Sequence, residues 1–308
     1  MSDLVSRGTI LSRIVYDEQN SVAATYGILN HEPATHRAAA IPKCTISEDR
    51  QPMTTLDQFT LTTVPLQQYF GEQPLGHATG FMWQAREGDY LVTNWHVLSM
   101  CDFFTRANLR KDGGRPDVLR TLFNARTGSF DKQRWDIRIR DDDDRPLWLV
   151  HPARRLDIAV LPVLFPPPQE LIIALYPINR LANAALRIEI GMEVFILGYP
   201  FRIQPPAYPV WKRGSIASEP DLARLTTDYM LVDTASRPGM SGAPVIRRSW
   251  TNHMVQPGVM ALVDSPLNKF IGVYSGRVPT DHPHEAQIGL VWDGSFIDEI
   301  IAGNVRDA

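Results

Sequence analysis

Three residue types that together can activate a hydroxyl group occur in this chain in the order histidine, aspartate, serine: His96, Asp157 and Ser241. A serine hydroxyl attacks a carbonyl poorly at neutral pH unless a base takes its proton and a third group fixes the tautomer of that base. We therefore consider His96 as the base, Asp157 as the orienting carboxylate and Ser241 as the nucleophile. The chemistry that such a set performs is acyl transfer.

The histidine and the aspartate each border an apolar run. His96 follows residues 90–94, and we expect it at the end of that strand, where a side chain is both positioned and accessible. Asp157 begins the run 158–163, beside which a carboxylate is costly unless a group such as the histidine Nδ1–H binds it. Taken singly, each residue also fits a structural role, as an anchored histidine or as a surface aspartate paired with a neighbouring arginine.

The segment around the serine, residues 237–245, is the more specific signal. Gly239 leaves the backbone unobstructed two positions before Ser241, so the two amides can converge on a carbonyl oxygen as charge develops there. Gly239 and Ser241 are therefore the predicted oxyanion hole. The alternative is a glycine- and proline-rich turn between two strands.

Short β-branched and aromatic runs bounded by Gly, Pro, Asp and Asn predict an all-β protein from residue 59 onward. The clearest predicted strands are residues 80–83, 90–94, 158–163, 192–198, 229–233, 243–246, 270–275 and 289–292. One helix is expected after Ser295, with Asp298 completing a capping box and Gly303 ending the helix.

The three motifs resemble those of the trypsin-like serine peptidases of the chymotrypsin-fold superfamily. Thr93-Asn94-Trp95-His96-Val97 is similar to the family's histidine motif, Asp157-Ile158-Ala159-Val160-Leu161 to its aspartate motif, and Pro238-Gly239-Met240-Ser241-Gly242-Ala243-Pro244 to its serine motif. The resemblance implies two six-stranded antiparallel barrels, with the three residues in the cleft between them and a C-terminal helix. It implies a serine endopeptidase that acts on a protein or peptide and needs no cofactor.

The resemblance also implies boundaries. Residues 59–165 are expected to form the first barrel with His96 and Asp157, and residues 166–308 the second barrel with Ser241 and the helix. Residues 1–58 have no counterpart in the family and are an extension of unknown role. Because Met240 stands where secreted animal members carry an aspartate, the chain looks closer to bacterial, disulfide-free members.

By their position relative to Ser241, five residues resemble the substrate-binding part of the family: Ala235, Ser275, Gly276, Arg277 and Gly289. Ala235 provides no counter-charge for a basic side chain, so cleavage after Lys or Arg is disfavoured. We expect an uncharged, small-to-medium apolar residue before the cleaved bond. An acidic residue, attracted by Arg277, is the alternative.

The composition excludes several other classes. A net charge of -3 and a pI of about 6.2 give no general attraction to nucleic acid or to an anionic membrane. Two cysteines and the lack of an apolar leader or a long apolar segment predict a soluble, cytoplasmic protein. The run 281–285 crowds two histidines and two acidic residues together, but without a distant partner we expect a polar loop and no metal.

Two other functions stay open at this point. The chain could keep the peptidase fold as a binding module whose site is made inert by its first 58 residues or by a distorted Gly239-Met240 peptide. It could also be an esterase with the same three residues. The strand-turn-helix elbow of α/β hydrolases is missing, because Ala243 stands at the position of the second glycine and the following residues predict a strand.

Overall fold

The computed structural model describes residues 56–126, 131–166, 170, 172–181, 183–202, 208–235, 237–278 and 287–308, and the backbones of two strands near the N-terminus. Those two strands, β1 (Ser12–Tyr16) and β2 (Val22–Tyr26), pair with each other in an antiparallel sheet. The predicted loop 281–285 lies outside the described residues.

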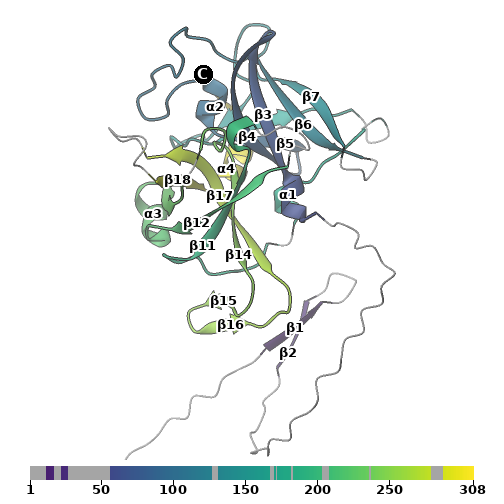
Figure 1. The fold of residues 1–308 in the computed structure, drawn as a ribbon, viewed down its shortest axis with the longest axis vertical. Coiled ribbons are helices and arrows are strands. Elements are labelled where there is room, and N and C mark those ends of the chain that lie inside the picture. The colour runs from purple at the N-terminus through teal and green to yellow at the C-terminus, as the bar shows by residue number, and fades with distance from the viewer. Residues whose placement is uncertain are drawn as a thin grey trace, which may run out of the picture.

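The first half of the described chain and the C-terminal strand β19 form one antiparallel sheet of nine strands, and the strands of the first half are dark blue to teal in Figure 1. Its strands are β3 (Thr63–Phe70), β4 (Gln73–Gln84), β5 (Asp89–Thr93), β6 (Val118–Ala125), β7 (Lys132–Arg138), β8 (Leu149–Val150), β9 (Ala159–Val163), β10 (Ile173–Ala174) and β19 (Val305–Arg306). Two short helices flank it, α1 (Gln58–Thr62) before β3 and α2 (Trp95–Ser99) after β5.

The second half closes into a barrel of six strands, in the order β11-β12-β13-β18-β17-β14. These strands are β11 (Glu193–Gly198), β12 (Val210–Ile216), β13 (Tyr229–Asp233), β14 (Pro244–Ser249), β17 (Leu267–Arg277) and β18 (Ile288–Asp293). Beside the barrel lie η2 (Pro200–Arg202), α3 (Pro220–Thr226) and a separate hairpin of β15 (His253–Gln256) and β16 (Val259–Ala261). Two further elements contact the first sheet: η1 (Ile178–Arg180) lies against β4, and α4 (Phe296–Gly303) against β8 and β9.

The predicted all-β class is confirmed, and one detail of the first barrel differs. The expected six-stranded ring is not continuous among the described residues, because β9 pairs with the two-residue strand β8 and not with β7. Residues between β7 and β8 fold back on themselves at this point, with Leu147 N–H donating to the Ile139 carbonyl at 3.0 Å. Strands of two residues carry no alternation that a sequence pattern could reveal.

Three apolar cores explain why these segments become strands. One fills the first sheet around Leu66, Met82 and Leu91, and another fills the second barrel. The third lies between the two halves, where Val92 and Ile158 from the first meet Trp292 and helix α4. Strands β5 and β9 therefore bury both faces, which is why their sequences read as continuous apolar runs and not as alternation.

The C-terminal helix α4 is confirmed, but its ends differ from those expected. Ser295 makes no capping hydrogen bond through its side chain, and the Asp298 carboxylate accepts from Trp83 Nε1–H at 2.9 Å instead of completing a capping box. Gly303 is the last helical residue, and Asn304 takes the left-handed conformation that ends the helix, with φ of 48°. Asn tolerates that conformation better than most residues.

After α4 the chain returns to the first sheet, because β19 pairs with β8. Asp307 then accepts hydrogen bonds from two indole N–H groups, Trp95 Nε1 at 2.7 Å and Trp148 Nε1 at 3.1 Å. Trp95 is the first residue of α2, so the end of the second half holds an element of the first. The boundaries predicted at residues 58 and 165 stay predictions.

We expect Asp307→Ala to destabilise the protein by about 2 kcal/mol, because two indole donors lose an ionised acceptor. For a chain of this size this lowers the Tm by about 5 °C, measurable by thermal unfolding. Asp307→Asn is the matched control, since its amide oxygen still accepts. An unchanged Tm in Asp307→Ala would contradict the structural role of this carboxylate.

Candidate active site

His96 lies on helix α2, and the prediction that it sits at the end of a strand was wrong by a few residues. Strand β5 ends at Thr93, Asn94 is the N-cap of α2, and His96 is the second residue of that helix. Met100 ends the helix in the left-handed conformation, with φ of 57°. A helix of five residues is too short to show a helical periodicity, so the sequence did not distinguish it from the apolar strand before it.

Asp157 is fully buried, and the structure places it against His96 as predicted from the motifs. Its Oδ2 lies 2.7 Å from His96 Nδ1, and its Oδ1 accepts from the His96 backbone N–H at 2.9 Å. The side chain of Asn94 also donates to the Asp157 backbone carbonyl at 2.7 Å. The carboxylate therefore holds both the ring and the backbone of the histidine, which fixes Nδ1 as the protonated nitrogen and leaves Nε2 to accept.

Ser275 has a contact that the sequence analysis did not predict. Its hydroxyl donates a hydrogen bond to Asp157 Oδ2, the oxygen that also faces His96 Nδ1. Ser275 lies on β17 of the second barrel, whereas His96 and Asp157 belong to the first half. Sequence position had assigned Ser275 to substrate binding only, and a contact across 118 residues leaves no local signal in the chain.

The pKa of His96 is raised above its usual 6.5 by the sum of opposing influences. Burial of the imidazole, the largest influence, lowers the pKa. The charge of Asp157, its hydrogen bond and the charge of Asp102 all raise it and together outweigh burial. Asp102 follows α2 and is held as a carboxylate by the N–H groups of Phe104 and Thr105, at 3.1 and 2.7 Å.

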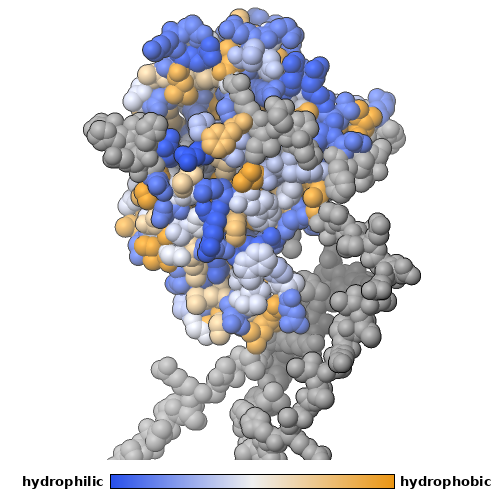
Figure 2. All heavy atoms as spheres, in the orientation of Figure 1, coloured by the Kyte–Doolittle hydropathy of each residue, from blue (hydrophilic) through white to orange (hydrophobic). Residues whose placement is uncertain are grey.

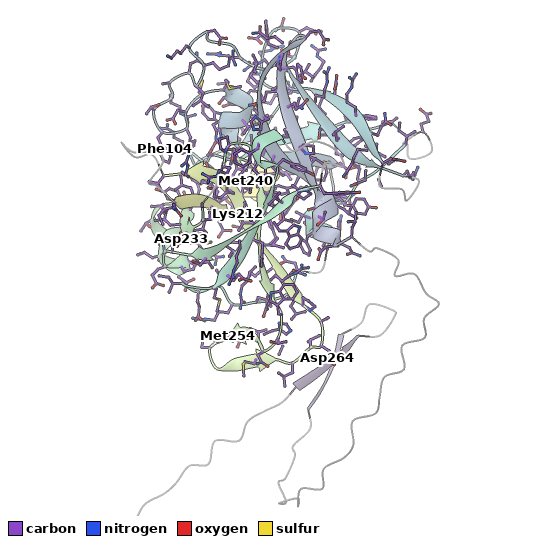
Figure 3. The ribbon with its side chains drawn as sticks, in the orientation of Figure 1. Phe104, Lys212, Asp233, Met240, Met254 and Asp264 are labelled. Atoms are coloured by element: carbon purple, nitrogen blue, oxygen red, sulfur yellow. The ribbon has the colours of Figure 1, made fainter. Side chains whose placement is uncertain are left out.

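Ser241 lies in the tight turn that precedes β14, next to Met240, which Figure 3 shows at the level where the two halves meet. Its carbonyl accepts from the Thr79 N–H on β4 at 2.8 Å, and the next amide, that of Gly242, donates to the Tyr274 carbonyl on β17 at 2.9 Å. Gly242 has φ of 82°, and a Cβ there would collide with Thr79 and Thr93. Only glycine allows the turn to come this close to the first sheet.

The serine is close to the histidine–aspartate pair without being bonded to it. A Cβ placed on Gly276, which follows Ser275, would lie 3.9 Å from Ser241 Oγ. Among the described contacts, however, no hydrogen bond joins Ser241 Oγ to His96 Nε2. The structure therefore brings His96, Asp157 and Ser275 into one bonded group and places Ser241 beside it.

The predicted oxyanion hole has its two amides unengaged. In the part of the chain that the structure describes, neither Gly239 N–H nor Ser241 N–H donates a hydrogen bond. The Pro238 carbonyl accepts from Phe201 N–H at 3.3 Å, and the Gly239 carbonyl from the Thr79 hydroxyl at 2.7 Å. Because the carbonyl and N–H of one planar trans peptide point in opposite directions, binding of the Pro238 carbonyl by Phe201 turns Gly239 N–H the other way.

The five residues assigned to substrate binding do not all come together. Gly276 and Arg277 extend β17 beyond its pairing with β14, so their outer edge pairs with no strand among the described residues. Ala235 lines a separate polar cavity of about 400 Å³, together with Asp233 and Gln287.

The space beside Gly289 is filled by a residue that the sequence analysis overlooked. A Cβ on Gly289 would collide with the ring of Tyr274, a fully buried side chain of β17. A large ring in contact with this glycine narrows the barrel interior behind residues 275–277. Tyr274 therefore occupies the space beside Gly289.

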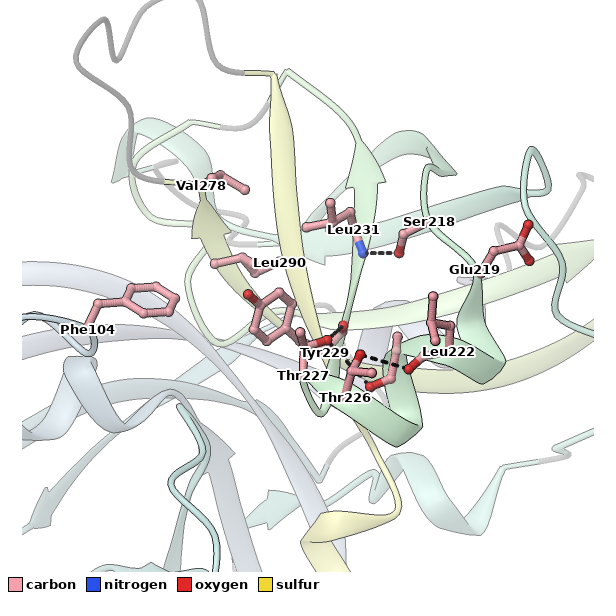
Figure 4. Close-up of a pocket in the computed structure, with 11 residues that line it drawn as sticks. Phe104, Ser218, Glu219, Leu222, Thr226, Thr227, Tyr229, Leu231, Val278 and Leu290 are labelled. Atoms are coloured by element: carbon pink, nitrogen blue, oxygen red, sulfur yellow. Dashed lines mark hydrogen bonds between the residues drawn. The ribbon is translucent and has the colours of Figure 1, made fainter.

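An apolar cavity of about 520 Å³ lies past the end of β17. Figure 4 shows Phe104 pointing toward it from the loop after α2, opposite Tyr229 and Leu290 on the outer face of the barrel. Leu222 of α3, Leu231 and Val278 complete its apolar wall. The cavity begins one residue after Arg277, so it continues the open edge of β17.

Neither a metal centre nor a membrane span is evident where the structure describes the chain. Within the described ranges, no three His, Cys, Asp or Glu side chains are grouped so that they could hold an ion. No helix in those ranges is both long and apolar enough to cross a bilayer.

Residues 78–252 match the family model of the trypsin-like peptidase domain. Because the match covers more than half of the 308 residues, the chain belongs to the family of trypsin-like peptidases. Membership implies a protease that acts on a protein substrate. The matched region contains His96, Asp157 and Ser241.

Two solved structures are similar to the chain at low identity. A serine endoprotease from Yersinia pestis is 13% identical, with a TM-score of 0.45, and the match covers 83% of this chain and 69% of that chain. A protein from M. tuberculosis H37Rv, solved as a serine-to-alanine mutant in an inactive form, is 17% identical, with a TM-score of 0.41 and coverage of 79% and 86%. No curated protein matches the sequence.

We expect Asp102→Asn to move the acid limb of the pH–activity profile to lower pH, because the Asp102 charge raises the pKa of His96. A base must be neutral, so activity is lost as pH falls through the His96 pKa, and a lower pKa extends activity to more acidic pH. Asparagine keeps an oxygen for the N–H groups of Phe104 and Thr105. Profiles of kcat/KM that superimpose would contradict the electrostatic role of Asp102.

Proposed function

We propose that the chain is a serine endopeptidase that hydrolyses peptide bonds through an acyl-enzyme formed on Ser241. The observation that carries this proposal is the buried pair of His96 and Asp157, joined by two hydrogen bonds and lying beside a serine in a glycine-lined turn. A buried carboxylate held against the Nδ1 of a histidine leaves Nε2 as an acceptor. Family membership supports the same class of reaction.

In the proposed mechanism, Ser241 Oγ attacks the scissile carbonyl carbon while its proton passes to His96 Nε2. The carbonyl oxygen becomes an oxyanion that accepts from the Gly239 and Ser241 amides, and Asp157 stabilises the imidazolium. The C–N bond then breaks, and the leaving amine takes the proton from His96. A water molecule then gives a proton to His96 and attacks the ester carbonyl carbon. The bond between that carbon and Ser241 Oγ breaks, Oγ takes the proton back from His96, and the carboxylic acid product leaves.

This mechanism requires a hydrogen bond between Ser241 and His96 that is not among the described contacts. Catalytic hydrogen bonds are often long or misaligned without substrate and tighten when it binds. The His96 ring is pinned by Asp157, so we expect the adjustment to come from rotation of the Ser241 hydroxyl about its Cα–Cβ bond. Such a rotation about one bond leaves the turn unchanged.

For the substrate, we propose an extended peptide that pairs with the open edge of β17 at residues 275–277. Backbone pairing of this kind is a common way for a sheet edge to hold a peptide. Tyr274, which fills the space beside Gly289, favours a small residue before the cleaved bond and narrows the earlier expectation of a small-to-medium one. Residues further toward the substrate's N-terminus would reach the apolar cavity past Val278.

We expect a fluorophosphonate probe to label the full-length protein and to fail with Ser241→Ala, because the probe reacts only with an activated serine. Labelling is read by fluorescence after denaturing electrophoresis. Thermal unfolding of Ser241→Ala provides the folding control, since the hydroxyl makes no described hydrogen bond. A folded wild-type protein that resists labelling at every pH from 6 to 9 would favour the inert binding module.

A second prediction concerns specificity. A peptide library varied at the residue before the cleaved bond should favour Ala, Ser or Val over Phe, Lys and Arg by roughly tenfold or more in kcat/KM. Tyr274→Val should reduce that preference, because removing the ring opens space beside Gly289. Preference for Lys or Arg in the wild-type protein would contradict the assignment of this region as the specificity site.

A further inference from the structure

The hairpin β15–β16 projects from the second barrel between β14 and β17, and Figure 3 marks it with Met254 and Asp264. Large apolar side chains in and beside it are exposed, to 55% for Trp250, 47% for Val259, 54% for Met260 and 47% for Leu262. We call these four residues the hairpin patch. Hydrophobic atoms are visible at this lower tip of the described body in Figure 2.

The hairpin is anchored firmly at its base. His253 is fully buried, its Nδ1 lies 2.9 Å from Ser249 Oγ, and its Nε2 lies 3.3 Å from the Val263 carbonyl. One imidazole ring thus contacts the chain on both sides of the hairpin, at Ser249 where β14 ends and at Val263 between β16 and β17. The hairpin patch is therefore exposed on an element whose position is fixed. A fixed apolar surface in contact with water indicates a binding site for another segment or protein.

The outer edges of the hairpin lack two of the features that block pairing, a charged residue and a proline. Neither β15, with sequence HMVQ, nor β16, with sequence VMA, contains a charged residue or a proline, and in the described structure each pairs only with the other. Sheet edges of this kind readily accept a further strand unless a charge or a proline blocks them. A sheet of two strands is also only marginally stable by itself.

The described body of the chain begins beside β14, the strand that leads into this hairpin. Asp57, the N-cap of α1, forms an ion pair with Arg248, the residue two positions before Trp250. The Arg248 guanidinium lies 5.3 Å from the centre of the Trp250 ring and 4.6 Å from that of Trp211. The described body therefore begins near Trp250, one of the four residues of the hairpin patch.

The N-terminal segment contains a second two-stranded sheet, and one of its strands also lacks a charged residue and a proline. Among the described residues, strands β1 and β2 pair only with each other, and the sequence of β2, VAATY, again has no charge and no proline. The chain from Tyr26 to Leu56 spans up to about 100 Å when extended, so it reaches the hairpin easily. Tethering in one chain also raises the effective concentration of the two sheets to the millimolar range.

We propose that the hairpin β15–β16 is the docking site for this chain's own strands β1 and β2, so that the two small sheets join edge to edge over the hairpin patch. The proposal assigns a role to the N-terminal extension as a strand donor. It does not depend on the proposed peptidase activity. The chemistry of recognition is backbone pairing between uncharged strand edges, with Trp250 and Met260 covered by apolar side chains.

Hydrogen exchange of the full-length protein tests the pairing. In Ala24→Pro, which removes a backbone N–H and disrupts β2, amides of residues 253–261 should exchange about tenfold faster or more than in the wild type. Ala39→Pro, in the same extension but outside β1 and β2, is the matched control and should leave that exchange unchanged. Equal exchange in all three proteins, with unaltered protection of β11 and β17, would overturn the proposal.

Cross-linking identifies the occupant. With Cys44 and Cys101 replaced by serine, we introduce Thr25→Cys in β2 and Met260→Cys in β16 and add a short bis-maleimide. A cross-link within one chain at monomer mass supports the proposal. Thr25→Cys with Leu225→Cys, on α3 and 84% exposed, is the control and should give none. A product of dimer mass whose yield rises with concentration would replace the extension by a second copy as the occupant and overturn the proposal.

Discussion

The arrangement of this protein depends on one buried carboxylate. Asp157 has no exposed surface, so its charge must be satisfied entirely by protein donors, and these come from both halves of the molecule: His96 from the first and Ser275 from the second. An unpaired buried charge costs several kcal/mol even after relaxation. The two halves therefore have to dock in one relative position for the carboxylate to be stable, and that position also brings the Ser241 turn beside the histidine.

The Ser241 turn is held in a comparable way by backbone contacts from both sides. Thr79 of β4 binds the Ser241 carbonyl, and its hydroxyl binds the Gly239 carbonyl, while Tyr274 of β17 binds the Gly242 amide. These contacts use the carbonyls and amides that the proposed chemistry does not need. Among the described residues, nothing accepts a hydrogen bond from the amides of Gly239 and Ser241, and preorganised donors of this kind do not have to reorient as charge develops.

Much of this could be predicted from sequence, because the chemistry is encoded in local motifs. The predicted strands at β5, β9, β11 and β17 are present, and the predicted contact between His96 and Asp157 exists. Contacts that depend on the tertiary structure could not be foreseen. Ser275 reaches Asp157, Asp102 acts on His96, and Tyr274 fills the space at Gly289, and none of these has a signature in its own neighbourhood of the chain.

The return of β19 to the first sheet has a consequence for how the enzyme matures. Residues 305–307 are made after both barrels have left the ribosome's active centre, yet they complete the edge at β8 and bind Trp95, which begins the helix that carries His96. Domains generally fold in the order of synthesis. Here the contact that supports the start of α2 needs residues that are synthesised after every other strand of both halves, so α2 gains this support only late in folding.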